Sequence, residues 1–323
     1  MDSLSKYNIA ANICGNTYNL LKNNILEKNI TNIKQLYDIG MNSINTQCNT
    51  LNVVRKGVAY PISISLNNKI DHYTYDHENQ NIKKNDIVKI KLGVDIDGCI
   101  AMYSNTFIYN NENMENSYIT FLNNLKDKIL KQMYVGNTND ELRIYIETKC
   151  TKSKCFPITN NKSYQHLNNQ IYNNDGKYMI LNYKKLYDRN EYIIQKNDCF
   201  DFEENEIYTI NISIVPDDDN NDYKIKIDDS QSLYRLNDIY HGFKLKTSRV
   251  FHSLITKNHN FNVFNISEYL NDTKLRLGIK ECVNNKILER LPASFIDDNN
   301  KNVYSITFTV CIMDNNAVLL KYF

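Results

Sequence analysis

The chain has 323 residues, of which 42% are hydrophobic, and its 38 Lys and Arg against 37 Asp and Glu give a formal net charge of +1. This balance excludes a protein held to nucleic acid or membrane by a global field, so such binding would need a local patch. No apolar run suggests a transmembrane helix, and residues 1–16 lack the apolar core of a signal peptide. The eight cysteines form no framework, which is typical of a reducing compartment, so we expect a cytoplasmic protein with no membrane partner.

The first third of the chain predicts two helices followed by strands. Residues 1–27 place their apolar side chains near one helical face, and a second amphipathic helix is expected over 33–44. Residues 57–66 predict a strand. Residues 84–109 predict a β-hairpin, because apolar and polar residues alternate on both sides of the tight turn formed by Asp97 and Gly98.

The remainder of the chain predicts helices and then strands. The expected helices cover 117–134, 138–149 (opened by a Thr138–Glu141 capping box) and 271–289, and the expected strands cover 206–215, 223–228 (pairing with 206–215), 303–313 and 317–323. Residues 156–200 are polar and are expected to be irregular. No linker rich in Pro, Gly or Ser separates these parts, which predicts one α+β domain over 1–323. Its central sheet should bury Ile90, Leu92, Ile100, Ile210, Ile212, Phe308 and Val310.

Two pairs of residues could suggest a site but are better explained without one. Cys150 and Cys155 are separated by four residues with no second pair nearby, so two unrelated thiols are expected rather than a zinc site. Asp95 and Asp97 flank the hairpin turn, where solvation is the simpler explanation.

Residues 55–76 and 82–109 together resemble the pita-bread fold of type 2 methionine aminopeptidases. The segments FKLKTSRVF (243–251), LRLGIKECVNNKIL (275–288) and VYSITFTVCIM (303–313) look closer to the family of proliferation-associated protein 2G4, also called the ErbB-3-binding protein. Members of that family are non-catalytic relatives of the aminopeptidases. The resemblance covers the chain from about Lys6 to Phe323 and implies a type 2-like helical insert at 243–291 within the single domain.

The resemblance identifies the positions at which the peptidases bind two divalent metals through two aspartates, a histidine and two glutamates. The aspartates correspond to Lys91 and Met102 and the glutamates to Asn211 and Thr307. The histidine position falls nearest to Gln165 or His166, where the alignment slips. His72 corresponds to a histidine of the substrate pocket, and we expect it to be a hydrogen-bonded pocket wall.

These replacements remove the chemistry that the metals require. A dinuclear site needs anionic oxygen donors, and Met is no ligand for a hard dication. At roughly 4 Å and an effective dielectric of about 20, the charge of Lys91 would repel a dication by about 8 kcal/mol. We therefore expect no metal, no cofactor and no catalytic residue.

A local basic stretch is the best candidate for a binding surface. Residues 241–267 contain Lys244, Lys246, Arg249 and Lys257 and no Asp or Glu, whereas residues 201–230 carry ten acidic residues against two lysines. A solvated edge of the insert would explain the basic residues equally well. The resemblance favours binding, because the family's non-catalytic members dock on the large ribosomal subunit near the tunnel exit and contact rRNA through the insert.

We therefore expect a monomeric, ribosome-associated pseudoenzyme that contacts rRNA and tunnel-exit proteins, with a possible nuclear pool. One alternative is a metal-dependent aminopeptidase with displaced ligands. Another is a nuclear nucleic-acid-binding regulator, which is disfavoured because the family's lysine-rich tail has no counterpart in this sequence.

Overall fold

Helices and two antiparallel sheets make up the described part of the chain. The computed structural model describes residues 2–75, 80–110, 116–159, 161–167, 170–172, 176–182, 199–217, 223–237, 242–314, 316–320 and 322. The helices are α1 (Ser3–Leu26), α2 (Ile33–Asn49), α3 (Ser117–Leu130), α4 (Asn139–Lys152), α5 (Lys246–Asn258), the 3₁₀ helix η1 (Ile266–Glu268) and α6 (Arg276–Asn284). The strands are β1 (Lys56–Leu66), β2 (Lys69–Asp71), β3 (Ile87–Ile96), β4 (Cys99–Ile108), β5 (Cys155–Pro157), β6 (Asn161–Gln165), β7 (Tyr178–Leu181), β8 (Ile207–Pro216), β9 (Ile225–Leu236), β10 (Phe264–Asn265), β11 (Leu288–Ile296), β12 (Tyr304–Ile312) and β13 (Ala317–Leu319).

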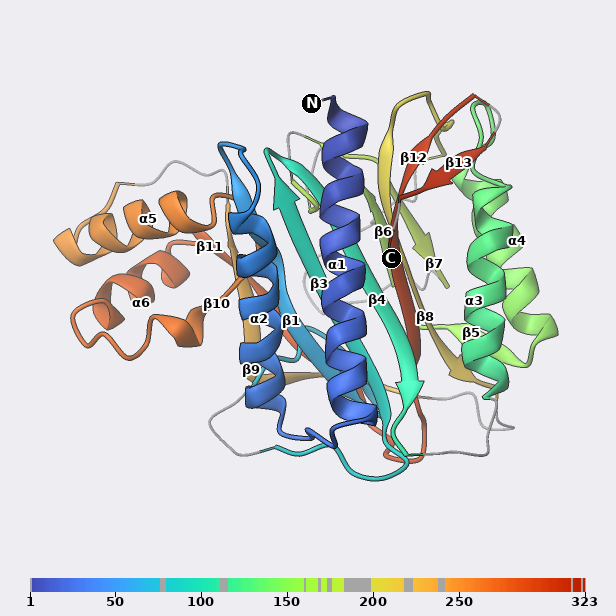
Figure 1. Ribbon diagram of the computed structural model, residues 1–323, viewed down its shortest axis with the longest axis horizontal. Coiled ribbons are helices and arrows are strands. Elements are labelled where there is room, and N and C mark those ends of the chain that lie inside the picture. The colour runs from blue at the N-terminus through green and yellow to red at the C-terminus, as the bar shows by residue number, and fades with distance from the viewer. Residues whose placement is uncertain are drawn as a thin grey trace, which may run out of the picture.

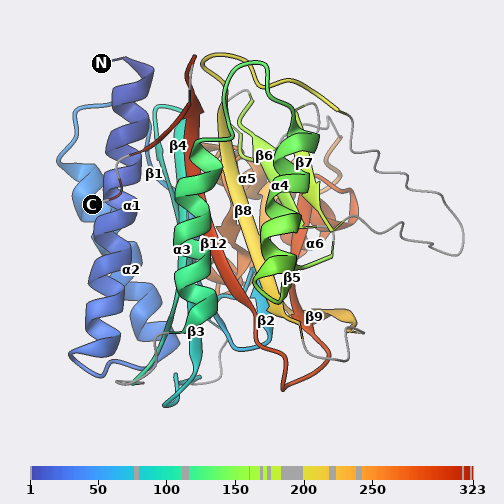
Figure 2. The same cartoon turned by 90° about the vertical axis from the view of Figure 1, so that its right-hand side faces the viewer.

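The elements form three layers. A nine-stranded sheet with the order β1-β3-β4-β12-β8-β6-β7, extended by β5 and β13, occupies the middle. Helices α1 and α2 cover one half of its front face and α3 and α4 cover the other half (Figures 1 and 2). A four-stranded sheet with the order β10-β9-β11-β2 forms the second sheet, and α5 and α6 project beside it. This arrangement is the predicted pita-bread α+β fold.

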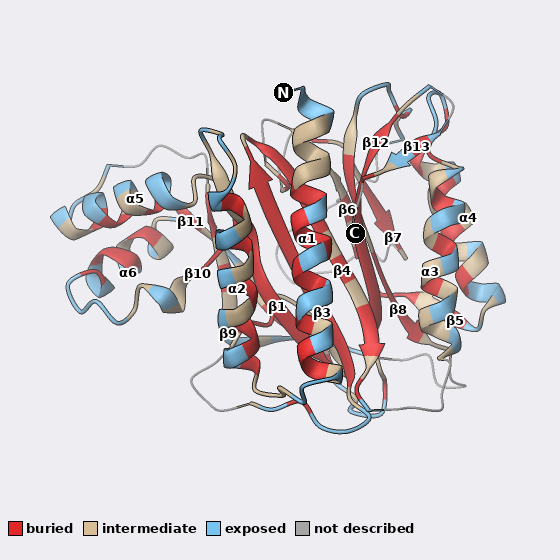
Figure 3. Cartoon of the chain, viewed as in Figure 1, coloured by how far each residue is buried: buried red, intermediate tan, exposed pale blue. Residues whose placement is uncertain are grey.

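Burial follows these layers. The strands of the central sheet are largely buried, and the helices bury the faces that they turn toward it (Figure 3). The seven apolar residues predicted for the central sheet are all 1% exposed or less, which confirms the prediction of its core. No helix in the described ranges is long and apolar enough to cross a membrane.

Local chain chemistry explains several of the element boundaries. Asp2 caps α1 by accepting from Ser5 N at 2.7 Å, and Thr138 caps α4 by accepting from Glu141 N at 3.1 Å. The turn residues Asp97 and Gly98 have φ angles of 51° and 88°, as a two-residue hairpin turn requires. The predicted hairpin and the predicted start of α4 are therefore confirmed.

The two halves of the central sheet meet along β4 and β12, which pair through the backbone only at Thr307–Ser104 and Phe308–Tyr103. Toward one end the hydroxyl of Thr106 donates to Ser305 O at 2.7 Å and accepts from Ser305 N at 2.9 Å. Side-chain hydroxyls therefore replace part of the backbone ladder at this junction.

Four expectations about the elements were wrong in part or in whole. Residues 156–200 contain the short strands β5, β6 and β7 within the described ranges. Strand β9 pairs with β11 and β10 rather than with β8, because alternation predicts a strand but not its partner. The helix expected over 271–289 is confined to α6, since the positive φ of Lys286 (56°) precedes strand β11. Helix α3 ends at Leu130, before the expected 134.

The expectation that Asp95 is solvated was also wrong. Its side chain is 1% exposed and accepts from Arg55 Nε at 2.6 Å and from Asn262 Nδ2 at 2.8 Å. Asp97 forms an ion pair with Lys6 Nζ at 2.9 Å. Tertiary contacts with β1, with α1 and with the segment before β10 take the place of solvent at this turn.

Cys150 and Cys155 are buried free thiols at the end of α4 and the start of β5. The thiol of Cys155 donates to Cys150 O at 3.4 Å.

Candidate functional site

Four strands of the central sheet bring three of the predicted positions into one row. In the antiparallel register, Lys91 on β3 pairs with Ser104 on β4, Ser104 with Thr307 on β12, and Thr307 with Asn211 on β8. Residues paired in this way point to the same face of a sheet. The four side chains line a cavity of about 10 Å³, which is about the space that one water needs.

Met102 lies beside this row rather than in it. It pairs with Gly93 and is fully buried in an apolar cluster with Tyr60, Ile100 and Leu233. A Cβ atom on Gly93 would lie 2.4 Å from Met102 Sδ, so the thioether occupies the space that the glycine leaves. The residue paired with Lys91 is Ser104, which the sequence analysis did not name as a candidate site residue. The two-residue turn at Asp97 and Gly98 fixes that register, so Ser104 could have been found from the sequence.

Lys91 forms an ion pair with Asp71, at the end of strand β2 in the second sheet. Asp71 also accepts from the backbone N of His72 at 2.8 Å and from the hydroxyl of Tyr60 at 3.2 Å. Burial alone would raise the pKa of Asp71, but Lys91 and then His72 outweigh it and hold that pKa at about 2. The charge of Lys91 is therefore balanced by the carboxylate of Asp71, a partner that the sequence analysis did not name.

His72 lies beside this ion pair in a left-handed backbone conformation, with φ of 64°. Its Nδ1 atom is 2.8 Å from the hydroxyl of Tyr60. Burial lowers the pKa of His72 below its usual value, which favours the neutral ring, and raises that of Tyr60 well above 10. The three side chains of Tyr60, Asp71 and His72 thus form one hydrogen-bonded cluster around Lys91.

A second lysine, Lys89, lines the same cavity. Its Nζ atom donates to Asn67 O at 2.7 Å and to Val303 O at 2.9 Å. Burial, aided by Lys69, lowers the pKa of Lys89 to about 7. Two lysines thus line the cavity, whereas a metal centre would require anionic ligands.

Gln165 and His166, the candidates for the histidine position, are not among the residues that line this cavity. Gln165 donates to Glu206 Oε1 at 2.7 Å. His166 Nε2 lies 2.7 Å from the hydroxyl of Thr209, and burial lowers the pKa of His166 to about 3. The hydroxyl of Thr209 lies 3.1 Å from that of Thr309, which accepts from Met102 N at 2.9 Å. His166 therefore belongs to a chain of hydroxyl groups on the same face of the sheet as the row, two residues further along β8 and β12.

The residues present do not fit a dinuclear metal centre. Asn211 Oδ1 accepts from the hydroxyl of Thr307 at 2.9 Å, and Asp71 is held by Lys91, Tyr60 and His72. In the described ranges no three His, Cys, Asp or Glu side chains are grouped so that they could hold a metal ion. The lining offers one carboxylate, that of Asp71, besides neutral oxygens and two lysines, and this set cannot offset the charge of two dications.

The four basic residues Lys244, Lys246, Arg249 and Lys257 (the basic edge) lie on or just before α5, away from this cavity (Figure 1). All four are exposed, and among the described residues none of their charged side-chain groups forms an ion pair with a carboxylate. On α5, Lys246, Arg249 and Lys257 follow the helical spacing of one face. His241, at the start of the predicted stretch, lies outside the described residues, as do 218–222 of the acidic stretch.

Glu281 from α6 lies against the start of this edge. Its carboxylate accepts from Lys244 N at 2.8 Å, from Leu245 N at 3.0 Å and from the hydroxyl of Ser248. The hydroxyl of Ser248 and then the backbone of Lys244 lower the pKa of Glu281. A carboxylate from outside residues 241–267 therefore caps α5, and the stretch is less strongly basic in space than in sequence.

The central sheet, the second sheet and the covering helices define a pita-bread protein. The profile of metallopeptidase family M24 matches residues 6–232, and the chain belongs to that family. It is 28% identical over 271 residues to proliferation-associated protein A of Dictyostelium discoideum, covering 81% of this chain and 66% of that protein. It is 27% identical over 274 residues to ErbB-3 binding protein 1 of Arabidopsis thaliana (83% and 66%) and 25% identical over 275 residues to a curved DNA-binding protein of Schizosaccharomyces pombe (82% and 69%). The aligned part is about two thirds of these relatives' length, and the predicted resemblance to the proliferation-associated family is confirmed.

Solved structures agree on the fold. A thermophilic Arx1 superimposes with a TM-score of 0.82 at 18% identity, covering 99% of this chain and 90% of that one. A methionine aminopeptidase of Thermotoga maritima superimposes with a TM-score of 0.63 at 10% identity (98% and 96%). At these identities the likeness establishes the fold alone.

Proposed function

We propose that this chain is a non-catalytic member of family M24 that binds the large ribosomal subunit near the tunnel exit as a cytoplasmic monomer. The row of Lys91, Ser104, Thr307 and Asn211 carries the non-catalytic part, because the family resemblance assigns Lys91, Thr307 and Asn211 to positions of metal ligands. Such a row offers no anionic donor to a metal, and water activation by metal ions needs a complete ligand set.

The basic edge supports the binding part of the proposal. Its four exposed cations have no ion-pair partner among the described residues, so phosphate oxygens can reach them without displacing a carboxylate. Phosphate contacts of this kind position a protein on RNA without reading its sequence. The ribosome is proposed as the partner because of the resemblance to the proliferation-associated family. That resemblance implies a helical insert at 243–291, and helices α5 and α6 belong to this range.

Co-sedimentation with large ribosomal subunits tests the binding part. Changing Lys244, Lys246 and Arg249 together to Glu should abolish co-sedimentation and leave the melting temperature nearly unchanged, because exposed charges contribute little to folding. The control variant changes three other exposed lysines, Lys28, Lys83 and Lys84, to Glu and has the same net charge. Binding that persists in the first variant, or is lost equally in both, would refute this docking surface.

The salt dependence of binding gives an independent measure of the same contacts. A few phosphate contacts should give a log–log slope of affinity against salt of roughly −2 to −4. Single changes to Ala within the edge should cost about 1 kcal/mol or less each, and more if Arg249 forms a bidentate contact with one phosphate.

Metal binding tests the non-catalytic part. Titration calorimetry with cobalt or manganese should show no micromolar binding, and no peptide with an N-terminal Met should be hydrolysed. The single change Lys91→Asp should not restore activity, because the ligands act as a set. Stoichiometric metal together with hydrolysis would instead support an aminopeptidase with displaced ligands.

A nuclear nucleic-acid-binding role is the second candidate, because one relative carries the name of a curved DNA-binding protein. The basic edge could contact DNA phosphates in the same way. A gel-shift titration with curved and straight duplexes separates the two functions, since the ribosomal proposal predicts no preference for curved DNA.

A further inference from the structure

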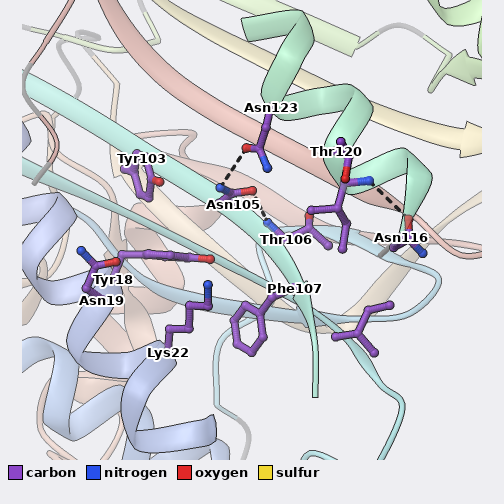
Figure 4. Close-up of a pocket in the computed structure, with 12 residues that line it drawn as sticks. Tyr18, Asn19, Lys22, Tyr103, Asn105, Thr106, Phe107, Asn116, Thr120 and Asn123 are labelled. Carbon is purple, nitrogen blue, oxygen red and sulfur yellow. Dashed lines mark hydrogen bonds between the residues drawn. The ribbon is translucent and has the colours of Figure 1, made fainter. Parts of the chain in front are cut away.

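A pocket of about 380 Å³ opens between α1 and α3 over strand β4 (Figure 4). We call it the α1–α3 pocket. Its floor includes Tyr103, Asn105 and Phe107, which alternate along β4 with Ser104. Successive side chains of a strand point to opposite faces, so this pocket lies on the opposite face of the sheet from the degenerate metal site. It is also remote from the basic edge, which lies on the far side of α2 (Figure 1).

The chemistry of the lining is polar and cationic. Helix α1 contributes Asn19 and Lys22, α3 contributes Thr120 and Asn123, and β4 contributes Asn105. Asn105 Nδ2 donates to Asn123 Oδ1 at 3.3 Å, which joins the two sides of the pocket (Figure 4). The described lining holds amides, hydroxyls and one ammonium group but no carboxylate, so it complements a ligand that is rich in hydrogen-bonding groups and negatively charged.

The aromatic rings of the pocket offer little surface for stacking. Tyr18 is 4% exposed and Phe107 is 7% exposed. Tyr103 is held between two other rings, with its centroid 5.0 Å from that of Tyr18 and 4.8 Å from that of Tyr322. A nucleobase is normally bound on an open aromatic face, which this arrangement lacks. Asparagine amides, by contrast, match the alternating donors and acceptors of a polypeptide backbone.

An extended segment of the chain itself occupies the neighbouring part of the same space. Strand β13 pairs with β12, and Tyr322 packs against both the apolar cluster that contains α1 and the apolar cluster that contains α3. The hydroxyl of Tyr322 donates to Met102 O at 2.9 Å and accepts from Thr309 N at 2.8 Å. The space between the two helices therefore accommodates a segment of polypeptide. Tyr103 contacts Tyr322 of that segment and also lines the α1–α3 pocket, so the pocket is adjacent to this space.

We propose that the α1–α3 pocket binds an extended, acidic polypeptide segment of a partner protein. Lys22 pairs with an acidic side chain of that segment, and the amides of Asn19, Asn105 and Asn123 bind its backbone. This site is independent of the proposed ribosomal contact, because it uses other residues on another face of the molecule.

Titration calorimetry of the full chain tests this proposal with a defined probe, the capped pentapeptide acetyl-Asp-Tyr-Asp-Tyr-Asp-amide. The wild-type chain should bind it, Lys22→Glu should weaken binding at least tenfold, and Thr120→Trp should abolish binding by filling the pocket. The matched controls are Lys28→Glu, two residues after the end of α1, and Asn124→Trp on α3; both positions are exposed, lie outside the lining and should bind as the wild type does. Melting curves of all four variants establish that they are folded.

Three results would overturn the proposal. The first is no binding of the acidic peptide, and the second is equal binding by the pocket variants and their controls. The third is binding of a peptide with Lys in place of Asp as tightly as the acidic one, which would remove the role of Lys22. Adenosine monophosphate is titrated in parallel, and binding of the nucleotide in place of the peptide would make this a nucleotide site.

Discussion

The ion pair of Lys91 and Asp71 should stabilise the fold, and its removal should have a distinctive pH dependence. Asp71 has a pKa of about 2 in the folded chain, below its ordinary value of 3.8. A carboxyl group with this difference adds roughly 2.5 kcal/mol to the free energy of unfolding at pH 7. That contribution is fully present above pH 4 and is lost as the pH falls through 2. Breaking such a buried pair from one side costs about 3–5 kcal/mol.

We therefore expect Lys91→Met to destabilise the chain by about 3 kcal/mol at pH 7. Without Lys91, burial remains as the main influence and raises the pKa of Asp71 above its ordinary value. The folded variant then holds a proton that the unfolded chain releases, so its stability falls as the pH rises through the new pKa. The loss relative to the wild type should be smaller at pH 4 than at pH 7.

Urea unfolding at pH 4 and pH 7 measures this difference. The double variant Lys91→Met with Asp71→Asn should recover most of the lost stability, because no unpaired charge is then buried. The exposed control Lys84→Met should change stability by less than about 0.5 kcal/mol. A loss below about 1 kcal/mol for Lys91→Met, equal at both pH values, would refute the view that Asp71 depends on Lys91.

Three further predictions concern the rest of the fold. Because the pKa of Lys89 is about 7 when folded, the unfolded chain binds more protons above pH 7, so Lys89 makes the stability rise from pH 7 to 10. Lys89→Met should remove that slope in urea titrations, and an unchanged slope would contradict the assignment. A Cβ on Gly278 would lie 2.6 Å from the backbone C and O of Thr247, so Gly278→Ala should cost about 1–3 kcal/mol, whereas Gly242→Ala, with open space around it, should be neutral in melting experiments. Limited proteolysis should release no pair of stable halves, and two such halves would show that the chain has separate domains.

Local patterns of the sequence account for much of the central sheet. Alternation predicts β3, β4, β8 and β12, because a strand that is packed in a sheet repeats its environment every two residues. The turn at Asp97 and Gly98 adds the register of the hairpin, since only residues that tolerate positive φ form such a two-residue turn. The place of Lys91 opposite Ser104 is therefore already contained in the sequence.

Contacts between segments that are far apart in the chain could not be predicted from these local sequence patterns. Asp71 reaches Lys91 from the second sheet, and Glu281 caps α5 from another helix. The partner of β9 was predicted wrongly because it too depends on a distant segment. The alternation of β9 is compatible with pairing to either β8 or β11, and the structure pairs it with β11. Sequence by itself determined the long strands of the central sheet and the hairpin turn, because these depend on residue type and local spacing. Only the tertiary structure decided which charges meet, because that depends on how whole layers pack and on which buried groups each layer brings within hydrogen-bonding distance.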